Sequence, residues 1–394
     1  MTWLVGLTEF AGVTGYTGGI GTHYAALLAA LAQQEHSIRV VLFTDEPIET
    51  TQLPKNIDLV GTHGLRFIPP FLRPLVRAAI FRRYWSSNQP DVVFVPEWAG
   101  VAALIPRRAA VITNLATGLR LGDWIAARKN RDLPARMRLS RWVQDRMETR
   151  QIRRSRGLVS ISRAVLAWNE EHVGRLPPSI IVGNCVDVRA ITSRPSTPEL
   201  PAGWPSVDDV SPVVLFVGRL EVKKGVAVAM AAFTELLAAH PNARLVLCGA
   251  SGDSAFEPTR QDLLGGVAEA FRHQVTFLGH LASAPLVEAM RAATLVACPS
   301  LWEGFGNVAL EVKAVGAPLV VTSGSGYDDF CTDDLDCLMV PPGDAVALSR
   351  AFARLIDSAD LRQRIADAGR KSVENFTPDR IAHATAEAVR MLRD

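Results

Sequence analysis

The 394-residue sequence has little cysteine and no long apolar run. Its five cysteines are an odd number without a CxxC pair, which argues against a disulfide framework or a zinc site and favours reduced thiols. No apolar stretch reaches the roughly 18–20 residues that cross a bilayer. The opening MTWLVGLTEF lacks a basic leader and a small-residue cleavage site, so we interpret it as a first strand rather than a signal peptide.

Charge is unevenly distributed, although the formal net charge is only +2. Residues 1–185 carry 23 basic and 14 acidic side chains, whereas residues 186–394 carry 19 and 26. Apolar residues make up 48% and charged residues 21%, a globular composition in a chain long enough for two domains. We therefore expect a basic half and an acidic half with different partners.

Short β-branched runs alternate with helix-length segments along the whole chain. This pattern predicts parallel strands buried on both faces and joined by helical crossovers, which is a doubly wound α/β fold. The expected strands are Leu4–Leu7, Ile38–Phe43, Val92–Val95, Ala109–Leu115, Gly157–Ile161, Ile180–Val182, Val213–Val217, Arg244–Cys248, Val275–Leu278, Ala293–Cys298, Pro318–Thr322 and Leu338–Val340.

Five prolines in Arg194–Pro212 mark a break between two such sheets, because proline fits neither a helix interior nor a central strand. We predict a first domain over residues 1–190, a linker over 191–212 and a second domain over 213–377, with a helix over 378–394. Two such domains would enclose a cleft at the carboxyl ends of their strands, where doubly wound sheets bind ligands.

Two glycine-containing loops lie between an expected strand and a helix. In Thr17–Thr22, adjacent glycines allow a tight turn beside a helix N-terminus, so this segment is either an anion-binding loop or a plain turn. Gly218–Gly225 adds Arg219 and Lys224, which suit a diphosphate unless they are ordinary surface cations. Neither loop is a GxGxxG fingerprint, which counts against NAD.

The segment Cys298–Gly316 combines a strand end, a glycine-rich turn and a helix start near Asn307. Glu303 lies in the turn, and Glu311 follows about one helical turn inside the helix. Carboxylates accept two hydrogen bonds from vicinal hydroxyls, and amides at a helix start attract anions, so the pair fits a phosphorylated polyol. The alternative is a capping acid followed by a solvated glutamate.

Glu303 and Glu311 form an E-x7-E motif, and with the surrounding EGFGNVALE the chain resembles the retaining glycosyltransferases of family GT4. These enzymes have the GT-B fold, in which two Rossmann-like domains face a central cleft. The resemblance covers nearly the whole chain. Its further matches are Gly18–Gly21, Ser160–Ser162, Asn184–Asp187, Gly218–Gly225, Phe277–Gly279 and Pro341–Asp344.

The resemblance implies transfer of a hexose-type sugar from a nucleotide-sugar to an acceptor hydroxyl, without a cofactor. Arg219 and Lys224 would hold the diphosphate, and Glu303 the sugar. No metal is required, because these cations and a helix dipole can stabilise the departing diphosphate. The implied donor-binding set is Gly18, Gly19, Arg219, Lys224, Leu278, Gly279, Glu303, Gly304, Phe305, Gly306, Asn307, Val308 and Glu311, with the base at Leu278–Gly279, the ribose at Glu311, and Gly18 and Gly19 across the cleft. We add His280 to this set, because it directly follows the base-contacting segment.

Departures from the family pattern limit what can be carried over. Asn114 stands where many members have a histidine that contacts the donor sugar, and asparagine can hydrogen-bond but cannot shuttle a proton. The expected catalytic residues are Glu303, Arg219, Lys224 and Asn114. Asn114 is included only as a residue that contacts the donor sugar. Further departures are Asp329 in place of Glu, Lys313 in place of Met and Cys337 in place of Gly.

Two other features resemble functional residues. We expect His23 to contact the acceptor or a phosphate, unless it has no role in the chemistry. We interpret Asp334–Asp336 as an ordinary loop rather than a metal-binding DxD motif.

Two basic segments account for the positive half. Phe71–Trp85 places Leu72, Leu75, Val76, Ala79 and Ile80 on one helical face among arginines, and Arg120–Arg156 holds twelve basic residues against four acidic ones, with Leu139, Trp142, Val143 and Met147 as an apolar stripe. Such helices either lie on an anionic membrane or pack an apolar stripe into the core. The segments lack interleaved aromatics, which argues against nucleic acid. We expect a cytoplasmic protein, peripheral on the inner face of the membrane under the first interpretation.

Three functional classes remain open. The first is a retaining glycosyltransferase that acts on a lipid-linked, polysaccharide or glycoconjugate acceptor. The second is a nucleotide-sugar-binding homologue with weak turnover and a regulatory role, which Asn114 favours. The third is another GT-B-like enzyme, such as an epimerase or a phosphorylase, which the run of GT4 motifs disfavours.

Overall fold

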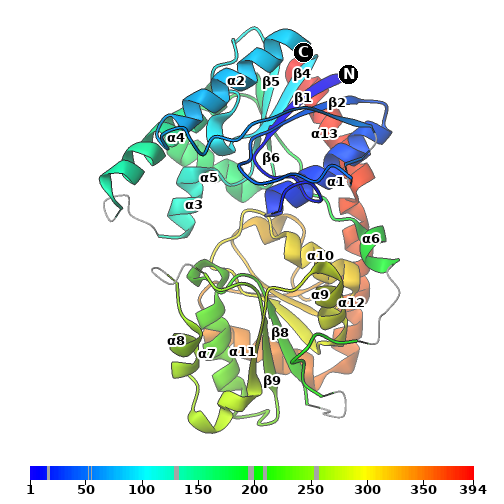
Figure 1. Cartoon of the computed structure of the whole chain (residues 1–394). Coiled ribbons are helices and arrows are strands. Elements are labelled where there is room, and N and C mark those ends of the chain that lie inside the picture. The colour runs from blue at the N-terminus through cyan, green and yellow to red at the C-terminus, as the bar shows by residue number, and fades with distance from the viewer. Residues whose placement is uncertain are drawn as a thin grey trace. The chain divides into compact units, whose positions relative to one another are not determined.

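The computed structural model describes residues 1–15, 18–51, 53–54, 56–127, 133–193, 199–206, 211–252 and 257–394. The chain divides into two compact units (Figure 1). Unit 1 comprises Met1–Cys185 and Phe376–Asp394, so both termini belong to it, and unit 2 comprises Val186–Asn375. Residues 186–190, which the sequence analysis assigns to the first domain, therefore lie in unit 2. Much of the predicted linker, residues 194–198 and 207–210, lies outside the described residues.

Unit 1 is built on a seven-stranded sheet in the order β3-β2-β1-β4-β5-β6-β7, and all six strand pairs are parallel. The strands are β1 (Thr2–Leu7), β2 (Ser37–Leu42), β3 (Ile57–Thr62), β4 (Val92–Pro96), β5 (Val111–Leu115), β6 (Gly157–Ser160) and β7 (Ser179–Ile181). The edge strand β3 is absent from the predicted set. Its sequence, IDLVGT, is mostly only partly buried, so it lacks the continuous apolar run of the inner strands.

Helices flank this sheet, and the C-terminal helix α13 (Pro378–Arg393) packs against α1. Both helices bury small and branched apolar side chains in the same core as β1 and β2. The other helical segments are α1 (Gly19–Gln33), α2 (Arg73–Asn88), η1 (Trp98–Gly100), α3 (Leu119–Ile125), α4 (Ala135–Arg154) and α5 (Arg163–Val173). α5 begins where the side chain of Ser162 accepts a hydrogen bond from the Val165 amide.

Helix α2 turns a different face to the core than the apolar pattern suggests. Pro74, Ala78 and Phe81 are its buried residues, whereas Leu72 and Leu75 are 37% and 39% exposed. Of the two alternatives for this stripe, core packing therefore does not apply to Leu72 and Leu75, which face solvent. The reason is that proline, alanine and phenylalanine at helical spacing give a second apolar face, which packs on η1 and α4.

Unit 2 contains a six-stranded parallel sheet in the order β10-β9-β8-β11-β12-β13. The strands are β8 (Val213–Val217), β9 (Arg244–Cys248), β10 (Val275–Gly279), β11 (Leu295–Cys298), β12 (Leu319–Thr322) and β13 (Leu338–Val340). The strand order reverses between β8 and β11, which is the switch point where doubly wound sheets bind ligands at their carboxyl edge. Two sheets of this kind confirm the predicted α/β class.

The helical segments of unit 2 cover its sheet, and α7 packs against α11. They are α6 (Val188–Thr192), η3 (Val222–Lys224), α7 (Val226–Leu236), α8 (Arg260–Gly265), η4 (Glu269–Gln274), α9 (Ser283–Ala292), α10 (Asn307–Val315), η5 (Gly326–Asp329), α11 (Ala345–Asp357), α12 (Ala359–Val373) and η6 (Glu374–Phe376). α6 starts at the Asp187 cap and packs on α10, which explains why the unit begins before the prolines. Among the described helices of both units, none is long and apolar enough to span a bilayer.

Candidate functional site

Two loops at the carboxyl edge of the unit 2 sheet meet backbone to backbone. One follows β8 and the other follows β11. Gly225 ends the first loop at φ +72°, and a Cβ atom at this position would lie 1.9 Å from the carbonyl oxygen of Pro299 in the second. Only glycine tolerates both the left-handed backbone and this approach. A hydrogen bond from the Leu301 amide to the Lys223 carbonyl, at 2.9 Å, adds a second link.

This junction brings Lys224 and Glu303 together. The Nζ atom of Lys224 lies 2.5 Å from Oε2 of Glu303, and both side chains are partly buried. The hydroxyl of Ser300 donates to the same carboxylate oxygen at 3.1 Å. Lys224, predicted to bind phosphate, and Glu303, predicted to bind sugar, are thus in contact where the strand order of the sheet reverses.

Arg219 is held beside them by a buried acid that the sequence analysis did not select. Its Nη1 atom lies 2.9 Å from Oε1 of Glu221, and Nζ of Lys223 lies 3.2 Å from the other carboxylate oxygen. Glu221 is only 4% exposed, whereas half of the Arg219 side chain remains accessible. Glu221 therefore fixes the base of a cationic loop whose guanidinium stays open to a ligand. The only signal in the sequence is one acid within GRLEVKKG.

The glycine-rich turn before α10 is rigid. Gly306 has φ +106°, and a Cβ atom there would lie 2.2 Å from the ring of Tyr327. The Gly326 amide donates to the Glu303 carbonyl at 2.9 Å, and Phe305 packs on Phe330 with ring centroids 4.8 Å apart. The stretch Gly304–Asn307, whose amides are expected to hold the donor sugar with Glu303, is therefore packed against the η5 segment and Phe330.

Glu311 lies in the second turn of α10 and retains some solvent-accessible surface. Burial raises its pKa to about 7. Within the described parts of the chain, the Glu311 carboxylate has no hydrogen bond or ion pair. Glu311, Glu303 and Lys224 all lie close enough to the Cys298 thiol to shift its pKa, so the three charged groups share one small region.

The predicted base-contacting segment ends β10. Leu278 is partly buried, Gly279 adopts φ +72°, and His280 is exposed directly after it. The Gly249 amide donates to the Gly279 carbonyl at 2.8 Å, which ties this strand end to β9. These residues belong to the same carboxyl edge as Arg219 and Glu303.

In unit 1, the glycine loop holds a carboxylate of its own. The amides of Gly18 and Gly21 donate to the two carboxylate oxygens of Glu9, each at 2.8 Å. The loop amides therefore bind an internal carboxylate, and binding of a ligand anion stays a prediction. Gly19 begins α1 next to it, and Thr17 lies outside the described residues. His23 accepts a hydrogen bond from the Cys185 amide at 3.2 Å, and burial lowers its pKa to about 4, so it is neutral.

Asn114 lies in β5 with its side chain inside unit 1. Its Oδ1 atom accepts from the Tyr24 hydroxyl at 3.2 Å, and Nδ2 donates to the Val159 carbonyl at 3.0 Å. The residue is only 2% exposed. A contact with a donor sugar remains a prediction; it would use the second N–H of Nδ2 or the second lone pair of Oδ1, because these two bonds take one of each.

Two further buried carboxylates of unit 1 were not selected from the sequence. Glu97 accepts from the Ala116 amide at 2.9 Å, and Glu148 accepts from the amides of Ala99 and Leu119 at 2.9 and 2.7 Å. Burial raises the pKa of Glu97 to about 8 and that of Glu148 to about 7. They fix the loops that follow β4 and β5. The sequence gives no sign that Glu148 is buried, because it lies in the arginine-rich helix α4.

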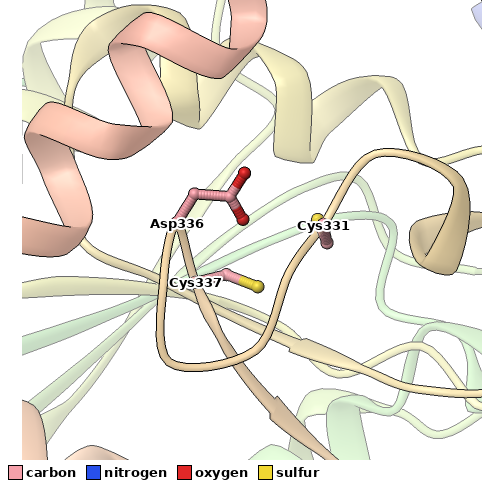
Figure 2. Close-up of side chains that lie close together, drawn as sticks. All are labelled: Cys331, Asp336 and Cys337. Carbon is pink, nitrogen blue, oxygen red and sulfur yellow. The ribbon is translucent and has the colours of Figure 1, made fainter.

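The Asp334–Asp336 triplet is a loop whose carboxylates are already engaged. Asp334 pairs with Arg354 and Arg364, and Asp336 pairs with Lys313 at 2.8 Å. Figure 2 shows Asp336 beside Cys331 and Cys337, a buried group with the side chains that metal ions favour. The Lys313 ammonium, however, takes the carboxylate and places a positive charge there. The cluster therefore does not fit a cation site.

The chain matches two family models. "Glycosyl transferases group 1" matches residues 205–372, and "Glycosyl transferase 4-like domain" matches residues 18–185. The glycogen synthase of Mycobacterium tuberculosis is 26% identical over 407 aligned residues, covering 94% of this chain and 90% of that protein.

Solved structures with the same fold include the sucrose-phosphate synthase of Thermosynechococcus elongatus, with a TM-score of 0.73, 20% identity and 99% of both chains covered. The Anabaena protein Alr3699/HepE, solved in complex with UDP-glucose, has a TM-score of 0.70 at 17% identity, again over 99% of both chains. The two family models and these folds agree with the E-x7-E resemblance, so the chain belongs to the GT4 glycosyltransferases and has the GT-B fold.

Proposed function

We propose that this glycosyltransferase moves a hexose-type sugar from a nucleotide-sugar to an acceptor hydroxyl with retention of configuration. The observation that carries the proposal is the meeting of Lys224 and Glu303 at the switch point of the unit 2 sheet, close to Glu311 and in the same loop as Arg219. It agrees with the UDP-glucose complex of the Anabaena relative. The site residues named in the sequence analysis remain proposed donor contacts.

The donor diphosphate would exchange partners with residues already in place. Lys224 would leave Glu303 for a phosphate oxygen, and Arg219 would bind a second oxygen with its accessible guanidinium. Glu303 would then accept hydrogen bonds from sugar hydroxyls, and Glu311 from the ribose. Two cations and the N-terminus of α10 would stabilise the leaving diphosphate, so the reaction requires neither a metal nor a cofactor.

Retention follows because the acceptor hydroxyl attacks the anomeric carbon on the same face from which the diphosphate departs. The acceptor oxygen forms a bond to the anomeric carbon while the bond from that carbon to the diphosphate oxygen breaks. The acceptor proton passes to a phosphate oxygen of the leaving diphosphate. Glu303 positions the sugar and forms no covalent bond to it, unlike the nucleophile of a retaining glycosidase.

The test begins with a thermal-shift screen against UDP-, GDP-, ADP- and dTDP-hexoses, because a ligand that binds only the native state raises the melting temperature. Transfer or slow hydrolysis of the best donor would then be followed by NMR. We expect a product with the donor's anomeric configuration and turnover that survives EDTA. An inverted product, a trapped glycosyl-Glu303 ester or complete loss of activity with EDTA would each contradict the corresponding part of the proposal.

We further propose that unit 1 docks on an anionic membrane to reach a lipid-linked acceptor. α4 carries seven arginines against two acids, and Leu139 and Trp142 at its start are 46% and 53% exposed, with the Arg146 guanidinium 5.2 Å from the Trp142 ring centroid. The outward face of α2 adds Leu72 and Leu75. Exposed apolar anchors among cations complement a negative lipid surface. Val143 and Met147, in contrast, pack inside and take no part.

Vesicle flotation tests this surface. The protein should float with vesicles that contain phosphatidylglycerol, less so as salt rises, and not with neutral vesicles. The double variant Leu139→Ser, Trp142→Ser should lose most of the binding. Met391→Ser is the matched control, because Met391 is 68% exposed on α13 of the same unit. Equal flotation of both variants would contradict the proposed surface.

A binding protein with weak turnover is the second candidate, and the internal pairing of Asn114 favours it. Purified protein that binds a nucleotide-sugar but neither transfers nor slowly hydrolyses it would support this alternative. Transfer at a rate ordinary for an enzyme, about 1 s⁻¹ or more, would exclude it.

A further inference from the structure

We infer that Arg260 reads the nucleobase of the donor and selects a base whose accessible edge carries a keto oxygen, which means uracil, thymine or guanine rather than adenine. This inference rests on the proposed function, because it takes the carboxyl end of β10 as the segment beside the base. It adds a specificity-determining residue and a class of donor.

Arg260 lies directly over the end of β10. It is the first residue of α8, and its Cζ atom is 5.3 Å from the ring centroid of Phe277. Its Nη2 atom is 3.9 Å from the point where a Cβ atom would stand at Gly279. The guanidinium therefore borders the space left open by Gly279, next to the backbone predicted to contact the base.

The backbone that carries this arginine is well fixed. The Thr259 side chain accepts from the Asp262 amide at 3.1 Å, and the Asp262 carboxylate accepts from the Thr259 amide at 2.9 Å, which closes a capping box at the start of α8. The Phe277 ring supports the guanidinium through a cation–π contact. The side chain of Arg260 is therefore already restricted, and little rotamer entropy is lost when a ligand binds.

The donors of Arg260 are not taken by nearby acids. The Asp262 carboxylate is engaged by Thr259, and Oε2 of Glu257 accepts from the Val222 amide at 2.7 Å. Across residues 1–252 and 257–394, as far as they are described, no carboxylate lies within ion-pair distance of Arg260. The side chain is exposed. An oriented guanidinium with unfilled N–H groups thus stands at the proposed base position.

The chemistry of the guanidinium decides which base it favours. Arginine only donates hydrogen bonds. Guanine offers O6 and N7 as acceptors side by side, and uracil and thymine offer O4, whereas adenine places an amino group that donates beside its N7 acceptor. A donor facing an amino group leaves one polar group unpaired, which costs affinity. Keto bases should therefore bind more tightly than adenine.

The ratio of affinities separates base reading from simple charge attraction. The positive charge of Arg260 attracts the diphosphate of every nucleotide alike, but hydrogen bonds to the base alter the ratio between nucleotides. The experiment is calorimetric titration of the full-length protein with UDP, GDP and ADP. The variants are Arg260→Met, which removes the donors but keeps length, and Arg260→Lys, which keeps the charge but loses the planar fork.

The wild type should bind UDP or GDP about 5- to 150-fold more tightly than ADP, the range expected for one good contact between arginine and a base. Arg260→Met should bring that ratio below about 2, since the donors that discriminate are gone, and Arg260→Lys should lower it as well. Arg350→Met, the same exchange at an exposed arginine on α11, should leave the ratio unchanged.

Two results overturn the inference while the proposed function stands. One is tighter binding of ADP by the wild type, and the other is an unchanged ratio in a folded Arg260→Met protein. Failure of the wild type to bind any of the three nucleotides would overturn the proposed function and this inference with it.

Discussion

Lys224 and Glu303 are 79 residues apart in the chain, yet their charged groups are 2.5 Å apart. Each neutralises the other in the ligand-free protein. The pair therefore keeps a phosphate-binding cation and a sugar-binding carboxylate oriented at little electrostatic cost until a donor replaces both contacts.

Removing either cation should disable the donor site. Lys224→Ala and Arg219→Ala should each lower kcat/KM by about 10²–10³-fold, the range for losing one preorganised group that stabilises developing charge. Lys371→Ala, at an exposed lysine on α12, serves as the control and should keep wild-type kinetics. Steady-state transfer rates and calorimetric donor affinities provide the measurement. Unchanged donor affinity in both variants would show that the site is misplaced.

Donor affinity should depend on pH through Glu311. Burial raises its pKa to about 7, so the carboxylate that would hold the ribose is mostly protonated below this pH and charged above it. Affinity for the best nucleotide-sugar should thus be about tenfold weaker at pH 6 than at pH 8. Glu311→Gln should flatten the profile. A 2′-deoxyribose donor, which offers only one hydroxyl, should show little of the dependence, and an equally steep profile for it would argue against this role.

Unit 1 should lose stability in mildly alkaline solution. The pKa values of Glu97 and Glu148 are raised from 4.5 to about 8 and 7, so the folded protein keeps protons that the unfolded chain has lost. Raised acid pKa values give stability that is complete below the unfolded value and disappears as pH rises through the folded value. Between pH 6.5 and 8.5 the two groups together should lower the free energy of unfolding by about 2–3 kcal/mol.

Chemical denaturation of Glu97→Gln checks this expectation. The variant mimics the protonated acid and should show a smaller loss over the same pH range. Glu387→Gln, at an exposed glutamate on α13 of the same unit, should follow the wild type. Identical slopes for all three proteins would mean that Glu97 does not titrate in this range.

The buried pair of Lys313 and Asp336 should be strongly coupled. Their side chains are 1% and 5% exposed, and Lys313 also donates to the Phe330 carbonyl at 2.6 Å. Lys313→Met leaves a buried charge without its partner and should cost about 3–5 kcal/mol of unfolding free energy. The double variant Lys313→Met, Asp336→Asn removes both charges and should recover more than half of that loss. A double-mutant cycle with no coupling would contradict the pairing.

Much of the fold could be predicted because inner parallel strands are continuous apolar runs, as at Val213–Val217 and Leu295–Cys298. The strand Ile57–Thr62 was not predicted, because it is partly exposed and has no continuous apolar run. Glu303 and Lys224 were found because glycines and strand ends mark loops that bind ligands. Glu221, Glu148 and the partner of Lys313 could not be found, because pairing across tens of residues depends on packing that no local spacing encodes. The two alternatives for the apolar face of α2, membrane or core, could not be decided from the sequence, because two apolar faces compete on one helix.

The contact between Gly225 and Pro299 has a consequence for altering this enzyme. Because the backbones of the two loops touch there, side-chain changes in either loop act on both the diphosphate and the sugar positions, and a residue larger than glycine would separate them. The Gly225–Pro299 contact does not include the end of β10 or the start of α8. Efforts to exchange one donor nucleotide for another should therefore begin at Arg260 and its neighbours, where recognition can change while the reacting groups keep their spacing.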